Sequence, residues 1–345
     1  MIYKPSWFRE DEVMVSTAPT CGLTKGGRLL PLVNRQTGKR VQISDPETGE
    51  PIDAIDDQLR ADMEALRDGN LTPTLRFVPL DVVSMRTAVP TFFDRRFDDA
   101  FDAAMATERF QDFSSMTIGA LVENKLLFIR NGHGSPTQSV RVGTVPYIKV
   151  SDLRAGLVNI NPTNRVPTAV ARAFWRGKNS GLREWDLICP ERTSKNIGDF
   201  CMLMPGQEQV VTTKEVIVLR PGERANFDAF YLMWAMSLNI VRDQWRRVIF
   251  MQTNREDVGE RYFEIRIPLP IDRAHADKVS APFKAYYEGL AKARDGLREY
   301  LEDRDEHHFF LGTAAESISD IEAAEEDSAF EESALLGASA ELPAQ

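Results

Sequence analysis

The chain has 345 residues, of which 43% are hydrophobic and 27% are charged, and its formal net charge is -10. This length and balance are typical of a globular protein with one or two cores, and they exclude a fibrous or wholly disordered chain. No apolar stretch reaches the roughly 20 residues of a bilayer span and the N-terminus lacks the apolar core of a signal peptide, so we expect a cytoplasmic protein with no membrane partner.

Residues 1–110 are predicted to form an N-terminal arm with helices for partner docking. The segments CGLTKGGRLLPL and NRQTGKRVQISDPETGEPID are rich in residues that favour turns between short strands. Ile55, Leu59, Met63 and Leu66 recur at helical spacing, which predicts a helix over residues 53–67. A second helix is expected over residues 98–109.

Residues 111–273 are predicted to form a mostly-β domain with one internal helix. Short β-branched or aromatic runs such as VPYIKV, VVTTKEVIVL and YFEIRI are separated by turn residues. The internal helix is expected over residues 227–251, with a buried apolar stripe that includes Phe230, Trp234 and Trp245. Residues 121–270 hold 21 basic and 15 acidic residues, a surplus that phosphate contact requires but that a solvated surface would also show.

Residues 274–305 show the clearest helical pattern of the chain. Apolar residues alternate at spacings of four and three, which predicts a long coiled-coil helix that needs a partner. The residues expected to face that partner are Val279, Phe283, Tyr286, Leu290, Ala293, Leu297 and Tyr300.

Residues 311–345 are predicted to be a disordered acidic tail. They carry nine acidic residues and no lysine or arginine. Two interpretations are open, namely a tail that keeps the protein soluble and a segment that mimics DNA and competes for the basic surface.

The sequence lacks the common catalytic and metal-binding motifs. It has no GxxxxGK[ST] phosphate loop, no GxSxG elbow, no methyltransferase signature and no zinc spacing among its three cysteines. One nuclease-like match exists, in which Asp112 and Glu123 could hold Mg²⁺ beside Lys125, although a solvated strand edge would look the same. We therefore expect no catalytic residue, no metal and no cofactor in this chain.

Several sequence blocks together resemble the target-recognition domain of type I restriction-modification specificity subunits. They are TIGALVENKLLFIRNGHGSP with VPYIKVSDLRAGLVN, then EWDLICPERTSKNIGDFCML, then FYLMWAMSLN with FEIRIPLPI, and they occur in the family's order. The long helix stands where the family has its spacer helix. Upstream, CGLTKGGR resembles the C-terminal tail of N6-adenine DNA methylases.

The resemblance implies an α+β fold, in which a mostly-β target-recognition domain with one internal helix is followed by a long coiled-coil spacer helix. It implies a non-catalytic subunit that directs an N6-adenine DNA methyltransferase to double-stranded DNA, in restriction-modification or related phage defence. S-adenosylmethionine would bind to the partner methylase. The chain has one recognition domain where the family has two, so a second copy or the methylase is expected to complete the helix pair, and a restriction or translocation subunit is a further partner.

The resemblance also implies that loops of the recognition domain contact DNA. Polar and basic residues of types that bond to bases or phosphates are the candidates. They are Asn131, His133, Ser135, Gln138, Lys149, Arg154, Arg192, Ser194, Lys195, Asn196, Arg242, Arg246, Arg247, Gln252 and Asn254.

Each group of candidates has an ordinary structural alternative. The first four residues could serve turn chemistry alone. The arginines of residues 242–247 could form surface ion pairs with Asp243, Glu256 and Asp257. Asp152 is expected to be a structural cap. Two other functions stay open for the whole chain, a stand-alone Mg²⁺-dependent nuclease and a defence protein that binds a protein partner with the recognition fold.

Overall fold

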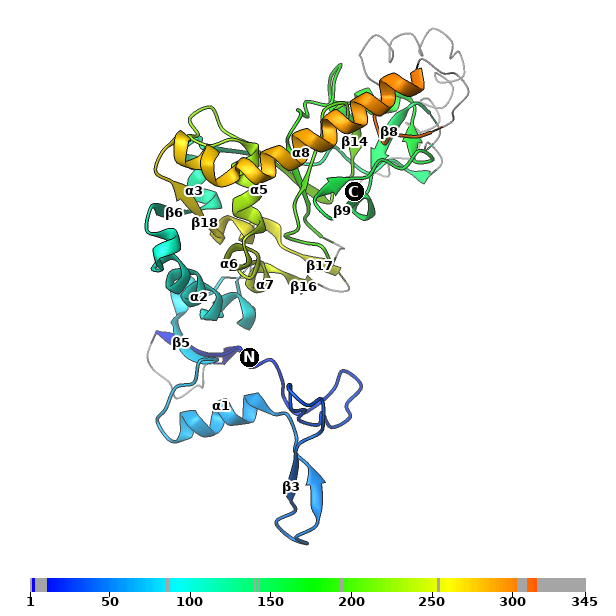
Figure 1. The fold of residues 1–345 in the computed structure, drawn as a ribbon. Helices are drawn as coiled ribbons and strands as arrows, with labels where there is room; N and C mark the ends of the chain where they lie inside the picture. Colours follow the sequence, from blue (N-terminus) through cyan, green and yellow to red (C-terminus); the bar gives the residue numbers. More distant parts are fainter. Residues whose placement is uncertain are drawn as a thin grey trace. The chain divides into compact units, whose positions relative to one another are not determined.

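A computed structural model describes residues 2–3, 11–84, 87–138, 141, 143–192, 195–252, 255–302 and 309–314. The chain divides into two compact units, Met1–Asp102 and Ala103–Gln345, and each is described by itself (Figure 1). The predicted acidic tail falls almost wholly outside the described residues.

Unit 1 has a small antiparallel sheet, a separate hairpin and a helix. The sheet has the order β1-β2-β5, and its strand β2 is buried along most of its length. The elements are β1 (Ile2–Tyr3), β2 (Glu12–Ser16), β3 (Gln42–Ser44), β4 (Pro51–Asp53), α1 (Gln58–Arg67), β5 (Leu75–Pro79), η1 (Leu80–Val82), η2 (Pro90–Phe93) and α2 (Arg96–Met105), the last of which continues into unit 2. Val13, Val15, Val78 and Phe93 form a core within this unit.

Helix α1 is tied to the sheet of unit 1 by a buried carboxylate. Asp62 is almost fully buried, and its oxygens accept hydrogen bonds from the hydroxyls of Ser16 (2.6 Å) and Thr74 (2.7 Å) and from the hydroxyl of Thr72. A buried carboxylate is tolerated when donors surround it in this way. The helix begins with Asp57, whose side chain accepts from the Arg60 backbone N–H.

Unit 2 contains most of the strands. Among its described residues the largest sheet has the order β7-β15-β12-β13-β10-β9, and smaller sheets pair β11-β8-β14, β16-β17 and β18-β6. The strands are β6 (Phe113–Thr117), β7 (Leu127–Asn131), β8 (Val145–Ile148), β9 (Leu153–Arg154), β10 (Leu157–Val158), β11 (Arg165–Val166), β12 (Leu187–Pro190), β13 (Cys201–Met202), β14 (Val211–Thr212), β15 (Val216–Pro221), β16 (Phe250–Gln252), β17 (Arg255–Asp257) and β18 (Arg266–Pro270).

The helices of unit 2 confirm the predicted α+β class but correct the single internal helix. Residues 227–251 form three short helices, because Leu238 is extended and the Gln244 amide bonds to the Arg266 backbone N–H and carbonyl of β18. Among the described residues of this unit, the α-helices α3 and α4 and the short 3-10 helices η3 and η5 precede them. The helices are η3 (Glu108–Phe110), α3 (Ile118–Glu123), η5 (Val150–Asp152), α4 (Thr168–Trp175), α5 (Ala229–Ser237), α6 (Asn239–Arg242), α7 (Trp245–Val248), η6 (Gly259–Glu264) and α8 (Arg273–Glu302).

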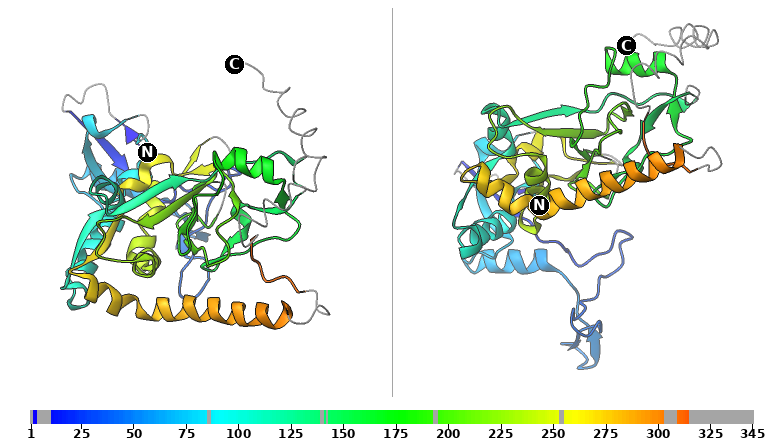
Figure 2. Two further views of the ribbon diagram at one scale, coloured as in Figure 1. Left: turned by 90° about the horizontal axis from the view of Figure 1, so that it is seen from above. Right: turned by 45° about the horizontal axis from the view of Figure 1, so that its top comes forward.

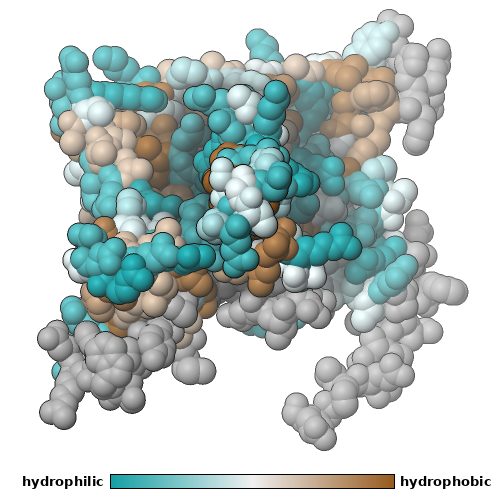
Figure 3. All heavy atoms as spheres, turned by 90° about the horizontal axis from the view of Figure 1, so that it is seen from below, coloured by the Kyte–Doolittle hydropathy of each residue, from teal (hydrophilic) through white to brown (hydrophobic). Residues whose placement is uncertain are grey.

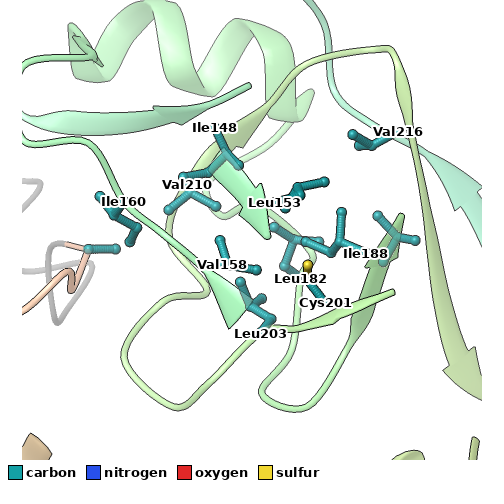
Figure 4. Close-up of a cluster of buried hydrophobic side chains, with 12 residues drawn as sticks. Ile148, Leu153, Val158, Ile160, Leu182, Ile188, Cys201, Leu203, Val210 and Val216 are labelled. Carbon is teal, nitrogen blue, oxygen red and sulfur yellow. The ribbon is translucent and has the colours of Figure 1, made fainter. Parts of the chain in front are cut away.

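The main core of unit 2 lies against the largest sheet (Figure 4). Side chains from β8, β9, β10, β12 and β13 converge there, and Ala314, from the segment after α8, joins the same cluster. Cys189 and Cys201 are buried free thiols, and burial raises the pKa of Cys201 to about 12. Both thiols therefore behave as small apolar side chains.

Helix α8 runs along one side of unit 2 (Figures 1 and 2). The Asp272 carboxylate caps it by accepting from the His275 backbone N–H (2.8 Å). Its inward face buries Ala276, Ser280, Tyr287 and Ala291. The Tyr287 hydroxyl donates to the Gly156 carbonyl between β9 and β10 (3.0 Å), so the helix is fastened to the rest of unit 2.

One face of the protein is drawn with its side chains in Figure 3. On the face drawn in Figure 3 hydrophilic residues predominate, and the hydrophobic residues form small separate patches. Within the described part of the chain, no helix combines the length and the apolar character that crossing a bilayer requires.

Gly198 offers a test of how tightly this unit is packed. It has φ +86°, and a Cβ there would lie 2.7 Å from the fully buried ring of Trp245. We expect Gly198→Ala to lower the free energy of unfolding by about 2–4 kcal/mol, because it adds left-handed backbone strain to overpacking. Gly177→Ala, where a Cβ would meet nothing within 4 Å, is the matched control. Equal urea midpoints for the two variants would contradict the packing.

Candidate nucleic-acid interface

Three loops meet at one end of the largest sheet. Ile217 pairs with Asn131, and Val216 pairs with Pro190, so β7 and β12 end where β15 begins. The loop after β7, the loop after β12 and the turn before β15 therefore share this end, which we call the loop end.

The loop after β7 is held close to the backbone of its neighbours. The Gly132 N–H donates to the Val216 carbonyl (2.9 Å) and the Gly134 N–H to the Thr212 carbonyl (3.1 Å). A Cβ at Gly132 would lie 1.8 Å from the Thr213 carbonyl oxygen, so only glycine allows this approach. The candidates Asn131, Ser135 and Gln138 are exposed on this fixed loop.

His133 is engaged inside the loop. Its Nδ1 accepts from the Thr212 backbone N–H (3.0 Å), and its Nε2 lies 2.7 Å from the Ser180 carbonyl, to which it donates. Burial, with a smaller contribution from the nearby Arg130 guanidinium, lowers the pKa of His133 to about 4. Both ring nitrogens have partners within the protein, so the ring holds the loop in place, and a contact of His133 with DNA stays a prediction.

A second group of candidates surrounds the short edge strand β9. Arg154 is exposed and its Nε donates to the Ser151 carbonyl (2.9 Å), while the Asn196 side chain lies 3.5 Å from the Leu153 carbonyl. Lys149 and Lys195 flank these residues along the chain. Asp152 accepts from the Lys149 backbone N–H (2.8 Å), which is the structural role expected for it, and burial raises its pKa.

The arginines of residues 242–247 are mostly occupied by internal partners. Arg242 pairs with Asp199 (2.6 Å) and Arg246 with Asp243 (3.2 Å). Arg247 is buried and donates to the Glu264 carbonyl (3.4 Å). The predicted DNA contacts of these three arginines stay predictions. The Arg246–Asp243 pair is one of the surface ion pairs expected as the alternative.

Of the four remaining candidates, one lies at the loop end, one lies in a strand, and two are outside the described residues. Arg192 lies at the loop end, 3.5 Å from the buried carboxylate of Glu191. Gln252 lies in β16. Ser194 and Asn254 are outside the described residues.

Sequence reasoning missed Lys214. It is exposed in the turn between β14 and β15, at the loop end, and it forms no ion pair with a residue of the described part of the chain. The signal was available in the sequence, since VVTTKEVIVL contains two strand-like runs separated by Lys214 and Glu215. Lys214 adds a cation beside Asn131 and Arg192.

The outward side of α8 carries the predicted partner stripe. Tyr286, Leu297 and Tyr300 are 52%, 40% and 49% exposed, whereas Phe283 and Leu290 are half-buried at the edge of the inward face. Val279 is half-buried and Ala293 is exposed. Four of the seven predicted residues are thus exposed, beside the face that unit 2 covers.

The nuclease-like match lies around β6 and α3. Asn124 follows α3, and its side-chain amide lies 4.0 Å from the Met116 sulfur of β6. Met116 is four residues after Asp112, which corresponds to about 13 Å of extended strand. Within the residues that the structure describes, no three His, Cys, Asp or Glu side chains form a metal-binding group.

Neither the family models nor the curated proteins contain a match to this chain. Solved structures similar to it include the type I restriction-modification S subunit from M. genitalium, at 12% identity and a TM-score of 0.37, over 54% of this chain and 43% of that chain. A chain from a structure of type I R-M complex assembly and conformational transition matches at 14% and 0.34, over 71% and 55%. The HsdS subunit from Thermoanaerobacter tengcongensis matches at 13% and 0.34, over 80% and 57%. The matched parts span about half the length of these structures, and the likeness is distant.

His133 gives the loop a pH dependence that can be measured. Since its pKa falls from about 6.5 in the unfolded chain to about 4 in the fold, it contributes stability above pH 6.5 that is lost as the pH falls toward 4. The full effect is about 3 kcal/mol at most. We expect the difference in free energy of unfolding between the natural chain and His133→Gln to be largest above pH 6.5 and to shrink toward pH 4. A difference that is constant over this range would show that the ring is not buried in its neutral form.

Proposed function

We propose that this chain is a sequence-reading DNA-binding subunit without a catalytic centre, which places an N6-adenine methyltransferase on double-stranded DNA. The observation that carries the proposal is the loop end, where exposed Asn131, Ser135 and Gln138 lie beside Arg192 and Lys214. Amides can bond to adenine edges and cations to phosphates, so one surface can both read and hold a duplex. The ordered sequence blocks of residues 116–303 support the same reading.

The rest of the proposal concerns partners. S-adenosylmethionine would bind to the methylase chain, and a restriction or translocation subunit would join in a restriction system. The domain roles follow, with residues 1–110 docking a partner, 111–273 reading DNA and 274–305 pairing with another helix. The alternative of a stand-alone Mg²⁺-dependent nuclease differs in predicting DNA cleavage by the isolated chain with Mg²⁺. The alternative of a protein that binds only a protein partner differs in predicting no DNA affinity.

The DNA-binding proposal is tested by separating phosphate contacts from base contacts. We expect Lys214→Ala and Arg154→Ala to weaken binding to all duplexes and each to reduce the salt slope by about 1. Asn131→Ala and Gln138→Ala should instead relax one position of the selected sequence at a cost of about 1–3 kcal/mol. The measurement is duplex selection from a random library, followed by titration at several salt concentrations.

Lys292→Ala is the matched control, because this lysine is exposed on α8 and has no ion pair among the described residues. If the natural chain, with and without a methylase, binds no duplex above the affinity of a random protein surface, the DNA-binding proposal is wrong. The protein-partner alternative would then be favoured.

The outward stripe of α8 is proposed to pair with a second copy of the chain or with helices of the methylase. We expect Tyr286→Lys with Tyr300→Lys to abolish this association, because charges would enter an apolar seam. Sedimentation and co-purification with the methylase measure it. Tyr287→Phe is the control, since Tyr287 lies on the inward face. A natural chain that is strictly monomeric and also fails to bind a methylase would contradict the proposal.

A further inference from the structure

A groove of about 600 Å³ lies at the end of β7 and β15 that is opposite to the loop end. Leu127, Phe128 and Ile129 of β7 line it together with Arg220 and Pro221 of β15. Phe128 is 44% exposed, which is unusual for an aromatic side chain in a sheet. We call this feature the β7–β15 groove.

The cations of the groove differ in what they already bind. Arg220 is bonded by two nitrogens to the buried Asp186 carboxylate (2.6 Å each) and lies over the Phe128 ring (5.4 Å). Lys125, Arg183 and Arg224 are exposed and form no ion pair with any described residue. Against them the lining contains one acidic side chain, Glu223. The rim is therefore cationic, while the floor is apolar and aromatic.

We infer that the β7–β15 groove binds the acidic segment of the chain's own C-terminal region, residues 325–332. This segment reads EEDSAFEE, in which five carboxylates flank Phe330, the one aromatic residue after Phe310. The carboxylates match the cations of the rim, and the phenyl ring matches the exposed face of Phe128. This inference stands whether or not the chain binds DNA.

The start of this region is fastened to the same unit as the groove. The Ala314 N–H donates to the Gly206 carbonyl (2.9 Å), and the Gln207 amide donates to the Gly312 carbonyl (2.9 Å). Ala314 packs in one cluster with Val216 and Val218, two residues of the strand that carries Arg220.

The length of chain beyond Ala314 is sufficient to reach the groove. Phe330 follows Ala314 by 16 residues, which can extend about 50 Å at roughly 3.3 Å per residue. Val218, which belongs to the same core cluster as Ala314, is two residues from Arg220. A tethered ligand also has an effective concentration on the order of millimolar, so that weak contacts suffice.

A nucleic-acid duplex is a poorer occupant. The groove lies at the opposite end of β7 from the polar loop residues, and its floor of Leu127, Phe128 and Ile129 offers nothing to a phosphate backbone. An acidic peptide with one aromatic side chain uses both the rim and the floor.

The test is cross-linking within the full chain. Phe330 is replaced by p-benzoylphenylalanine, which keeps an aromatic ring, and the products of irradiation are mapped by mass spectrometry. We expect cross-links to residues 122–129 and 220–224 of the same chain, as shown by a mixture of isotope-labelled and unlabelled protein. Arg183→Glu with Arg224→Glu should reduce their yield by about tenfold, because repulsion replaces two exposed attractions. High salt should reduce it as well.

Lys292→Glu is the matched control and should leave the yield unchanged. If the double glutamate variant fails to fold, Arg183→Gln with Arg224→Gln takes its place. The double glutamine variant should reduce the cross-link yield to a smaller extent. Cross-links scattered over the surface, cross-links between labelled and unlabelled chains, or a yield insensitive to the groove charges would overturn the inference. An unchanged yield together with a loss of DNA affinity would identify the groove as a nucleic-acid surface and would also overturn it.

Discussion

The position of β15 between β7 and β12 is the constraint on which the rest of unit 2 depends. Val216, Ile217, Val218 and Leu219 are fully buried, and the strand is paired along both edges. A two-residue shift of register would move Asn131 away from Pro190. A one-residue shift would exchange the two buried faces of β15 and disrupt the packing on both. The same strand places the loop end at its start and Arg220 at its finish, so one register positions both candidate binding surfaces.

The burial of charged groups in unit 2 determines which cations are already paired. Burying the Asp186 carboxylate without a partner would destabilise the fold, but it accepts hydrogen bonds from two nitrogens of Arg220. The same bonds hold the Arg220 guanidinium over the Phe128 ring. The same rule separates the other cations. Arg242 and Arg247 already satisfy internal acceptors, whereas Lys214, Arg183 and Arg224 have no anionic partner within the described part of the chain. The cations without an internal anionic partner can bind an external anion more strongly, because no internal contact must be broken first.

Periodicity made α8 predictable, and the α+β class with it, because a heptad pattern and β-branched runs are local signals. Local signals could not predict which apolar residues of the helix are buried against unit 2 and which are exposed. Tyr286 and Tyr287 are adjacent in sequence, yet the first is half exposed and the second bonds to Gly156. The helix has an inward face that unit 2 covers as well as the predicted stripe, and only tertiary packing decides which apolar residue lies on which face. The three short helices within residues 227–251 have the same origin, since Gln244 bonds to β18.

The candidate site was predictable in its residue types and less so in their roles. Asn131, Ser135 and Gln138 are exposed where a polar loop should expose them, but His133 belongs to the same loop and is engaged by Thr212 and Ser180, 79 and 47 residues away in the chain. A histidine among polar residues looks like a reader of bases until its long-range partners are known. The internal partners of His133 bear on the proposed recognition. In that proposal, a loop held by an internal ring and a close glycine contact loses less conformational freedom on binding, so more of the interaction energy of its exposed amides serves to distinguish one base from another.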